Sequence, residues 1–402
     1  MSMTTRAEDT ITETPRTTGR PRSPRNRHRL APLLTFGLLL GACTAVPPED
    51  ATAASPTGSS SSDMSSSGSA PSGSSSASGS APTEEPVGNV EVLASGLAAP
   101  WSIAFHDDTA LVSERDSGRI LELGPTGALR EVGAVPDVAA RGEGGLLGIA
   151  VQEGWLYAYY TAADENRIAR FELTGEAGSP RLGPQEMVLD DIPAATTHNG
   201  GRIAFGPDGL LYATTGDTND RASAQDLESL AGKILRLNPD GSTPVDNPFD
   251  DSPVYSYGHR NPQGIAWDEA GVMYSTEFGQ DTWDELNIIE AGGNYGWPKV
   301  EGVATTEGFL DPVQQWTPGE ASPSGMAITE ESIFVANLRG ERLREIPLED
   351  LEDSTIRAIG DQGRLRDVVV APDGSLWVLT NNTDGRGDPA VDDDRILRIS
   401  LQ

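Results

Sequence analysis

The chain has 402 residues, enough for one large domain or two of ordinary size. It carries 61 acidic against 29 basic residues, a formal net charge of −32 at pH 7. Such a surface repels phosphate backbones, which argues against nucleic-acid binding and suits a domain in an extracytoplasmic space, where acidic clusters can hold calcium.

The first 42 residues have the pattern of a bacterial secretion signal. Seven arginines and three acidic residues precede an apolar run at 30–40, which is too short for a permanent membrane span. The run ends in Leu40-Gly41-Ala42-Cys43, the pattern of a lipobox, in which the cysteine becomes the lipidated first residue. We therefore expect 1–42 to be a lipoprotein signal peptide. The alternative is an ordinary cleaved signal followed by an incidental cysteine.

Lipidated Cys43 would anchor the protein to the outer face of the bacterial membrane, its only contact with a membrane. It is also the only cysteine, so no intramolecular disulfide can form. Residues 44–86 are dominated by Ser, Gly, Ala, Pro and Thr, which provide too little apolar surface to offset the entropy of ordering. We therefore expect 43–86 to be a disordered tether that holds a single domain, 87–402, away from the membrane.

A short repeat in the domain sets the predicted architecture. Its first apolar strand occurs at 101–105, 147–151, 201–205, 263–267, 324–328 and 366–370. A turn and a second strand follow each copy, at 110–113, 155–160, 210–215, 272–276, 333–336 and 376–380. Third strands follow at, for example, 119–121, 167–171, 233–237 and 395–399. Copies start roughly 40 to 60 residues apart, which fits propeller blades.

The repeat predicts an all-β fold, a six-bladed β-propeller of four-stranded antiparallel blades. Helical periodicity is confined to 224–230. In a propeller the first strands surround a central channel, so the loops that precede them, and those that follow the second strands, converge on one pocket. Candidate functional residues are therefore expected in these loops.

Two histidines stand in Gly-rich segments just before first strands. His198 has no evident core role there, and Asp217 follows the second strand of the same blade. A histidine oriented and made more basic by a carboxylate is the usual general base near neutral pH. We therefore interpret His198 as a candidate base. For His259 we favour a structural role, in which the ring satisfies groups between neighbouring blades.

Arginine and amide side chains recur at the corresponding positions of the blades. They are Arg260, Asn261, Gln263, Arg339, Arg364 and Arg366. In so acidic a chain, several arginines directed at one pocket indicate an anionic ligand held by charge-assisted hydrogen bonds. The alternative is that each arginine pairs with a neighbouring acid, such as Asp361 or Asp367.

The loop at 277–287 follows a second strand and is rich in oxygen atoms. Its carboxylates and the free carbonyl groups of a tight turn at Gly279 suit a hard cation such as calcium. The loop lacks the diagnostic spacing of an EF-hand, so the pattern alone leaves the metal open.

From Val90 to Ile399 the sequence resembles the soluble quinoprotein glucose dehydrogenases and the related aldose sugar dehydrogenases. The resemblance rests on five motifs in order: GEGGLLG at 142–148, HNGGR at 198–202, GHRNPQG at 258–264, GGNYGWP at 292–298 and RLRD at 364–367. The family fold is a six-bladed propeller, in agreement with the repeat. The resemblance implies pyrroloquinoline quinone (PQQ) and Ca2+ as cofactors, an aldose sugar oxidised at C1 to its lactone, and an electron acceptor that stays unknown.

The resemblance also implies roles for individual residues. His198 resembles the catalytic base, Asp217 its partner and Arg260 the cation beside the quinone oxygens. The residues that match cofactor-binding positions are Glu143, Arg260, Asn261, Gln263, Arg339, Arg364 and Arg366. The residues that match calcium positions are Gly279 and Gln280, through their carbonyl groups, and Glu285 with the Tyr295 carbonyl at a second site.

Three positions depart from the family pattern. Gln280 stands where many relatives have proline, Arg339 where lysine is common, and Glu143 where some members have an amide that faces the substrate. The last departure leaves the sugar preference open. Two other functions are alternatives: a calcium-dependent lactonase, which needs several carboxylates around one metal, and a propeller that binds a ligand without catalysis.

Overall fold

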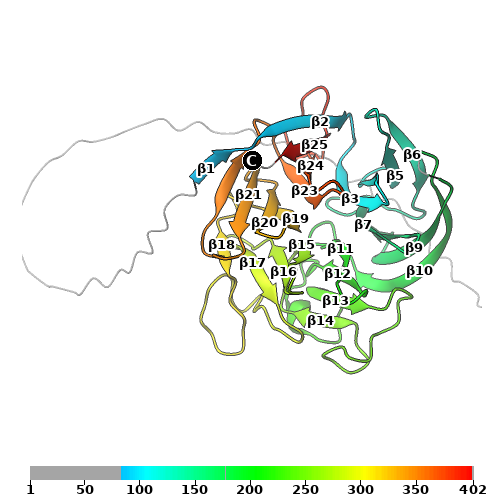
Figure 1. Cartoon of the computed structure of the whole chain (residues 1–402). Coiled ribbons are helices and arrows are strands. Elements are labelled where there is room, and N and C mark those ends of the chain that lie inside the picture. Colours follow the sequence, from blue (N-terminus) through cyan, green and yellow to red (C-terminus); the bar gives the residue numbers. More distant parts are fainter. Residues whose placement is uncertain (1–82, 177, 401–402) are drawn as a thin grey trace, which may run out of the picture. The chain divides into compact units, whose positions relative to one another are not determined.

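The computed structural model describes residues 83–176 and 178–400. These residues form six β-sheets arranged in a ring (Figure 1), which confirms the predicted six-bladed all-β propeller. The predicted signal peptide, Cys43 and the tether as far as residue 82 lie outside the described part. Within 83–176 and 178–400, no helix has the length and apolarity needed to cross a membrane.

Each blade begins with an inner strand at the channel, paired antiparallel with a second strand. The inner strands are β3 (Pro100–His106), β7 (Leu146–Gln152), β11 (Ile203–Phe205), β15 (Pro262–Trp267), β19 (Pro323–Ile328) and β23 (Leu365–Val370). The second strands are β4 (Thr109–Glu114), β8 (Trp155–Thr161), β12 (Leu211–Thr215), β16 (Met273–Glu277), β20 (Ser332–Asn337) and β24 (Leu376–Thr380). All twelve overlap the runs predicted from the repeat.

The third and fourth strands complete the blades toward the rim. The third strands are β5 (Arg119–Leu123), β9 (Glu165–Thr174), β13 (Lys233–Leu237), β17 (Asp284–Ile289), β21 (Arg342–Pro347) and β25 (Arg395–Ser400). The outer strands of five blades are β6 (Leu129–Ala134), β10 (Arg181–Pro193), β14 (Val254–Tyr257), β18 (Gln314–Trp316) and β22 (Thr355–Ala358). Among the described residues, the one helical element is the short 3-10 helix η1 (Arg221–Gln225), which only partly overlaps the predicted helical segment at 224–230.

The ends of the domain close the ring. β2 (Asn89–Ser95) pairs antiparallel with β25, so an N-terminal strand is the outer strand of the last blade. β1 (Thr83–Pro86) pairs in parallel with β22 and adds a fifth strand to the preceding blade. The last four residues of the predicted tether therefore belong to the propeller, and one blade has five strands instead of the predicted four.

The hydrophobic core lies between neighbouring blades, because each sheet buries the apolar side chains of both its faces against the next sheet. One cluster, for example, contains Tyr157 and Tyr159 of β8, Leu235 of β13 and Leu211 of β12. A cavity of about 330 Å3 in the channel is lined mainly by apolar residues of inner strands. The candidate polar residues lie mainly in the loops at the ends of these strands.

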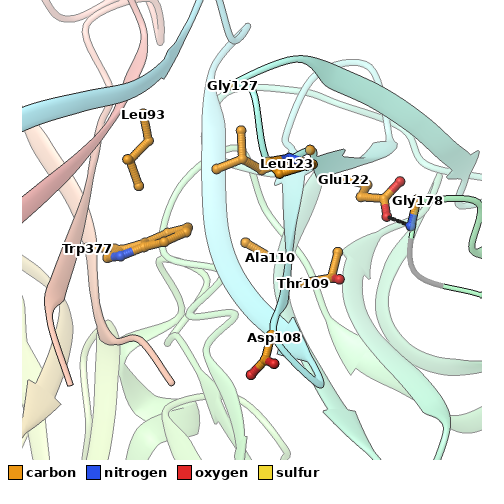
Figure 2. A pocket seen from close by; sticks show the side chains of 11 residues that line it. Leu93, Asp108, Thr109, Ala110, Glu122, Leu123, Gly127, Gly178 and Trp377 are labelled. Atoms are coloured by element: carbon orange, nitrogen blue, oxygen red, sulfur yellow. Dashed lines mark hydrogen bonds between the residues drawn. The ribbon is translucent and has the colours of Figure 1, made fainter. Parts of the chain in front are cut away.

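A further cavity, of about 510 Å3, lies between the blade of β3 to β6 and the blade that β2 and β25 close (Figure 2). Leu93, Leu123 and Trp377 give it apolar walls, and the Glu122 carboxylate at its edge accepts the Gly178 N–H at 2.7 Å. None of the candidate residues lines this cavity. It belongs to the interface between two blades and not to the channel mouth.

Candidate active site

His198 and Asp217 form the hydrogen-bonded pair that the sequence predicted. His198 precedes β11 and Asp217 follows β12, and Nδ1 of the ring lies 2.7 Å from Oδ1 of the carboxylate. Burial opposes ionisation of Asp217, but hydrogen bonds from His198, the Asn219 N–H and Trp297 outweigh it and hold the pKa of Asp217 below its usual value. In the described part of the chain His198 Nε2 has no hydrogen-bond partner, so it can face a ligand.

The backbone of His198 is held in an unusual conformation, with φ at 59°. Its N–H donates to Glu143 Oε2 at 2.9 Å, and Glu143 Oε1 pairs with Arg386 at 2.7 Å. Gly216 packs so closely that a Cβ atom there would lie 2.0 Å from the His198 carbonyl oxygen. Glu143, predicted to contact the cofactor, therefore has both oxygens engaged within the chain and steadies the histidine loop.

Arg260 lies beside this pair, in the loop before β15. Its guanidinium is 5.4 Å from the centre of the Trp297 ring, and Nη1 donates to the Phe278 carbonyl at 3.2 Å. Burial lowers the pKa of Arg260, and the nearby Asp217 carboxylate opposes that shift. Nε is buried without a hydrogen-bond partner in the described chain. Arg260 thus keeps an unused donor close to the His198–Asp217 pair.

Gln263 and Arg366 are linked across the channel. Arg366 donates from Nη1 to Gln263 Oε1 at 2.9 Å and from Nε and Nη2 to Asn381 Oδ1 at 3.0 and 2.8 Å. Burial lowers the pKa of Arg366 to about 9. Asn261 accepts the Gly200 N–H at 3.0 Å and leaves its Nδ2 without a partner among the residues described.

Arg364 and Arg366 share one carboxylate, that of Asp384, at 3.2 and 3.6 Å. Burial raises the pKa of Asp384, but the two arginines outweigh it and hold that pKa below its usual value. The alternative of ion pairs with acids therefore holds for Arg364 and Arg366, but Asp361 and Asp367, the partners named for it, were wrong. Asp367 instead pairs with Arg202 at 3.0 Å.

Arg339 follows β20 and is exposed, and within 83–400 (Ala177 excepted) it has neither a hydrogen bond nor an ion pair. The structure therefore leaves it outside the network that Arg364 and Arg366 form.

The candidate calcium residues lie on and after the loop between β16 and β17. Glu301 Oε1 accepts the N–H groups of Gln280, Thr282 and Trp283 at 2.7, 3.2 and 3.1 Å. These three hydrogen bonds hold the loop around the Glu301 carboxylate, which was not a candidate from the sequence. A Cβ atom at Gly279 would lie 1.7 Å from the Trp283 carbonyl oxygen, so the tight turn requires glycine.

The two residues proposed for a second calcium site are separately engaged. Glu285 accepts the Gly302 N–H at 2.7 Å and an Asn287 N–H at 3.1 Å, and burial, with the charge of Glu277, raises its pKa to about 8. The Tyr295 hydroxyl donates to the Ile288 carbonyl at 2.7 Å, whereas its main-chain carbonyl, the group named for the site, accepts no hydrogen bond in the described chain. No hydrogen bond joins Glu285 and Tyr295 within the described residues.

His259 has the structural role favoured from the sequence. It is fully buried, with Nδ1 2.8 Å from Glu277 and Nε2 2.8 Å from Ser256, and it stacks on Tyr295. Its partners are side chains of its own and the next blade. Glu277 also accepts the Arg260 N–H, so this buried pair supports the loop that carries Arg260.

The mouth fits an anionic ligand with several acceptor atoms. Three candidate positions carry buried donors without partners in the described chain, namely Arg260 Nε, Asn261 Nδ2 and Arg364 Nε. Arg344 and Arg395, in third strands of their blades, also have a buried Nε without a partner, so the feature is not confined to the mouth; at the mouth the acceptor atoms of a ligand can satisfy these donors. No group of three or more His, Cys, Asp or Glu side chains in that part of the chain is placed to hold a metal. The Gly279 and Gln280 carbonyl groups accept no hydrogen bond there, which fits main-chain binding of a hard cation.

The fold and this mouth define a class: a six-bladed propeller with a His–Asp pair and an arginine cluster at one end of its channel. The glucose/sorbosone dehydrogenase model matches residues 97–397, and the chain belongs to that family. This confirms the resemblance read from the motifs.

Three relatives illustrate the likeness. The chain is 33% identical over 342 residues to the aldose sugar dehydrogenase YliI of Escherichia coli, covering 74% of this chain and 91% of that one. It is 32% identical over 260 residues to quinoprotein glucose dehydrogenase B of Acinetobacter calcoaceticus, covering 54% of each. It is 48% identical to the PQQ-bound form of an aldose sugar dehydrogenase from Streptomyces coelicolor, with a TM-score of 0.75, covering 80% of this chain and 100% of that one.

Proposed function

We propose that this protein is a PQQ- and calcium-dependent dehydrogenase that oxidises aldose sugars at C1 to the lactone. The observation that carries the proposal is the His198–Asp217 pair beside a mouth where Arg260, Asn261 and Arg364 each keep one buried donor atom without an acceptor in the described chain. The relatives named for aldose and glucose oxidation, one of them bound to PQQ, support it. The physiological electron acceptor stays open.

Some residues at the mouth would bind the cofactors, and His198 would transfer the proton. Arg260, Arg364 and Arg366 would hold the carboxylates of PQQ, with Asn261 and Gln263 nearby, and the Gly279 and Gln280 carbonyls would hold calcium. PQQ, polarised by calcium, supplies the acceptor for a hydride.

His198 Nε2 would take the proton of the anomeric hydroxyl while the C1 hydrogen leaves with its electron pair, so that a C1 carbonyl forms. Asp217 would stabilise the imidazolium that results. The geometry of the pair, with Nδ1 held by the carboxylate, leaves Nε2 as the proton acceptor.

The proposal is tested with purified apoprotein, PQQ, calcium and an artificial electron acceptor, using a panel of aldoses. We expect reduction of the acceptor only when PQQ, calcium and a sugar are all present, and loss of that activity after calcium is chelated. No turnover with any sugar would overturn the proposal. Lactone hydrolysis without PQQ would favour the lactonase, and sugar binding without turnover the non-catalytic propeller.

We also propose that Cys43 is lipidated and anchors the protein outside the cell, on the sequence pattern alone. Expression of the full chain in a bacterium, with a radiolabelled fatty acid, tests this. Label should enter the wild type and be absent from Cys43→Ala. Label in both, or in neither, would contradict it.

Gly216→Ala should disable the site without replacing any side chain that is proposed to meet the ligand. The new Cβ would collide with the His198 carbonyl and with Asn261 Oδ1 at 2.9 Å, so the loop that carries the base must shift. We expect kcat to fall about 100-fold, because small misplacements of reacting groups have effects of that size. Gly319→Ala is the control, because its Cβ meets nothing within 4 Å. Equal activity of the two variants would contradict the close packing.

A further inference from the structure

One indole group, that of Trp297, contacts both the base pair and Arg260. Its Nε1–H donates to Asp217 Oδ2 at 2.8 Å, and its ring centre lies 5.4 Å from the Arg260 guanidinium. Trp297 is 6% exposed, and the chain fixes its backbone from two sides. Its N–H donates to the Gly258 carbonyl at 2.9 Å, and its carbonyl accepts the Gln225 amide at 2.8 Å.

The two oxygens of Asp217 have different partners. Oδ1 faces His198 Nδ1 at 2.7 Å and accepts the Asn219 N–H at 2.9 Å, whereas Oδ2 accepts the indole of Trp297. Without the indole, Oδ2 would be a buried carboxylate oxygen with no donor, and the carboxylate could rotate away from the imidazole. The indole thus helps to fix the orientation of the carboxylate toward the histidine.

The indole ring supports Arg260 in a second way. Guanidinium groups are attracted to the face of an indole within about 6 Å, and more strongly when both are desolvated. Arg260 is partly buried and makes one side-chain hydrogen bond, to the Phe278 carbonyl. The indole is therefore one of two groups that hold this guanidinium, together with the Phe278 carbonyl, and the same ring also lies 5.3 Å from the guanidinium of Arg221.

We propose that Trp297 is a positioning residue that couples the His198–Asp217 pair to Arg260, its N–H orienting the carboxylate and its ring holding the guanidinium. The expected kinetic effects rest on the proposed dehydrogenase function. The contacts of Trp297 with Asp217 and Arg260 do not depend on it. From the sequence, no side chain of the GGNYGWP motif had a role at the reacting centre. Trp297 is given one by this proposal.

Trp297→Phe separates the two contacts, because it removes the N–H and keeps an aromatic face. Trp316→Phe is a matched control: Trp316 donates its N–H to Gln314 at 3.1 Å and carries Arg344 at 4.9 Å, but in outer strand β18. We expect Trp297→Phe to lower kcat about tenfold with little change in KM, the effect of one charge-assisted hydrogen bond. The control should keep both constants.

The pH profile separates positioning from general damage. The indole N–H is one of the hydrogen bonds that hold the pKa of Asp217 below its usual value, so its loss raises that pKa and makes the carboxylate a stronger partner for the imidazolium N–H. The acid limb of kcat/KM should therefore move up by about half a unit to one unit in Trp297→Phe, and not in Trp316→Phe. Trp297→Leu, which lacks the ring, should also weaken PQQ binding to the apoprotein.

A measurement without turnover tests the contact itself. The indole N–H signals of the seven tryptophans can be followed in nitrogen-15-labelled apoprotein. Asp217→Asn should shift the Trp297 signal and leave the Trp316 signal in place. This arm does not require a Trp297 variant to fold.

The results of these experiments distinguish failure of the dehydrogenase proposal from failure of the proposed role of Trp297. A shifted indole signal without oxidation of any sugar would refute only the dehydrogenase. An unshifted signal, or Trp297→Phe kinetics equal to those of Trp316→Phe in an active enzyme, would refute the role of Trp297.

Discussion

His198→Ala is expected to lower kcat by about 100- to 10,000-fold, the range that a positioned general base contributes. The structure gives the reason: the ring is fixed by Asp217, and its Nε2 is the nitrogen left without a partner in the described chain. Removing the ring leaves the arginine cluster intact, so PQQ affinity should change little. Steady-state kinetics with saturating PQQ and a fluorescence titration of the apoprotein measure the two effects separately.

His106→Ala is the control, because His106 ends β3 and takes no part in the pair. Asp217→Asn should reproduce much of the kinetic loss, since it removes the charge that steadies the protonated ring. If His198→Ala kept activity within a few-fold of the wild type, another group would have to be the base. If it lost PQQ affinity in the same proportion as kcat, the histidine would be a binding residue.

The propeller could be predicted because its evidence is local and repeated. Each inner strand is an apolar run followed by a turn and a second run, and six copies leave few alternatives. The closure of the ring could not be predicted in the same way. β2 pairs with β25 and β1 pairs with β22, and both pairings join segments that are hundreds of residues apart. Each pairing occurs once, so it does not appear as a repeat in the sequence.

The His198–Asp217 pair was predictable for a related reason. β11 and β12 are antiparallel neighbours, with Ile203 opposite Ala213, so the residue before one strand and the residue after the other meet at the same end. The partner of the arginines was not predictable. Asp367 follows Arg366 in β23, and adjacent residues of a strand point to opposite faces.

The residues that the sequence did not single out come from connections that are distant in sequence from the residues they contact. Asp384, between β24 and β25, binds the two arginines of its own blade, while Trp297 and Glu301 reach the site from the long connection after β17. Loop conformation is not encoded in strand periodicity. For Trp297 a signal did exist, its place in a family motif, but the motif does not tell which atom the indole contacts.

Arg366→Met is expected to weaken PQQ binding about 10- to 100-fold, because it removes charge-assisted donors from a buried site. The side chain is 5% exposed, and burial already lowers its pKa, which indicates a cation kept at a cost in solvation. An anionic ligand would offset the solvation cost of this buried cation. A fluorescence titration of the apoprotein with PQQ measures the affinity.

The strength of this test lies in its control, Arg344→Met. Arg344 is also buried, at 3% exposure, and also has a pKa lowered by burial. Each guanidinium lies over a tryptophan ring, Arg344 at 4.9 Å from Trp316 and Arg366 at 5.7 Å from Trp101. Both variants should lower the unfolding temperature, because each removes a buried arginine from its partners. Only Arg366→Met should change PQQ affinity, since Arg344 contacts Ser354 at the outer part of its blade. Equal PQQ affinity in the two variants would mean that Arg366 serves the fold alone. The binding role would then have to lie with Arg260 and Arg364, the two arginines among the candidate residues that keep an Nε atom without a partner in the described chain.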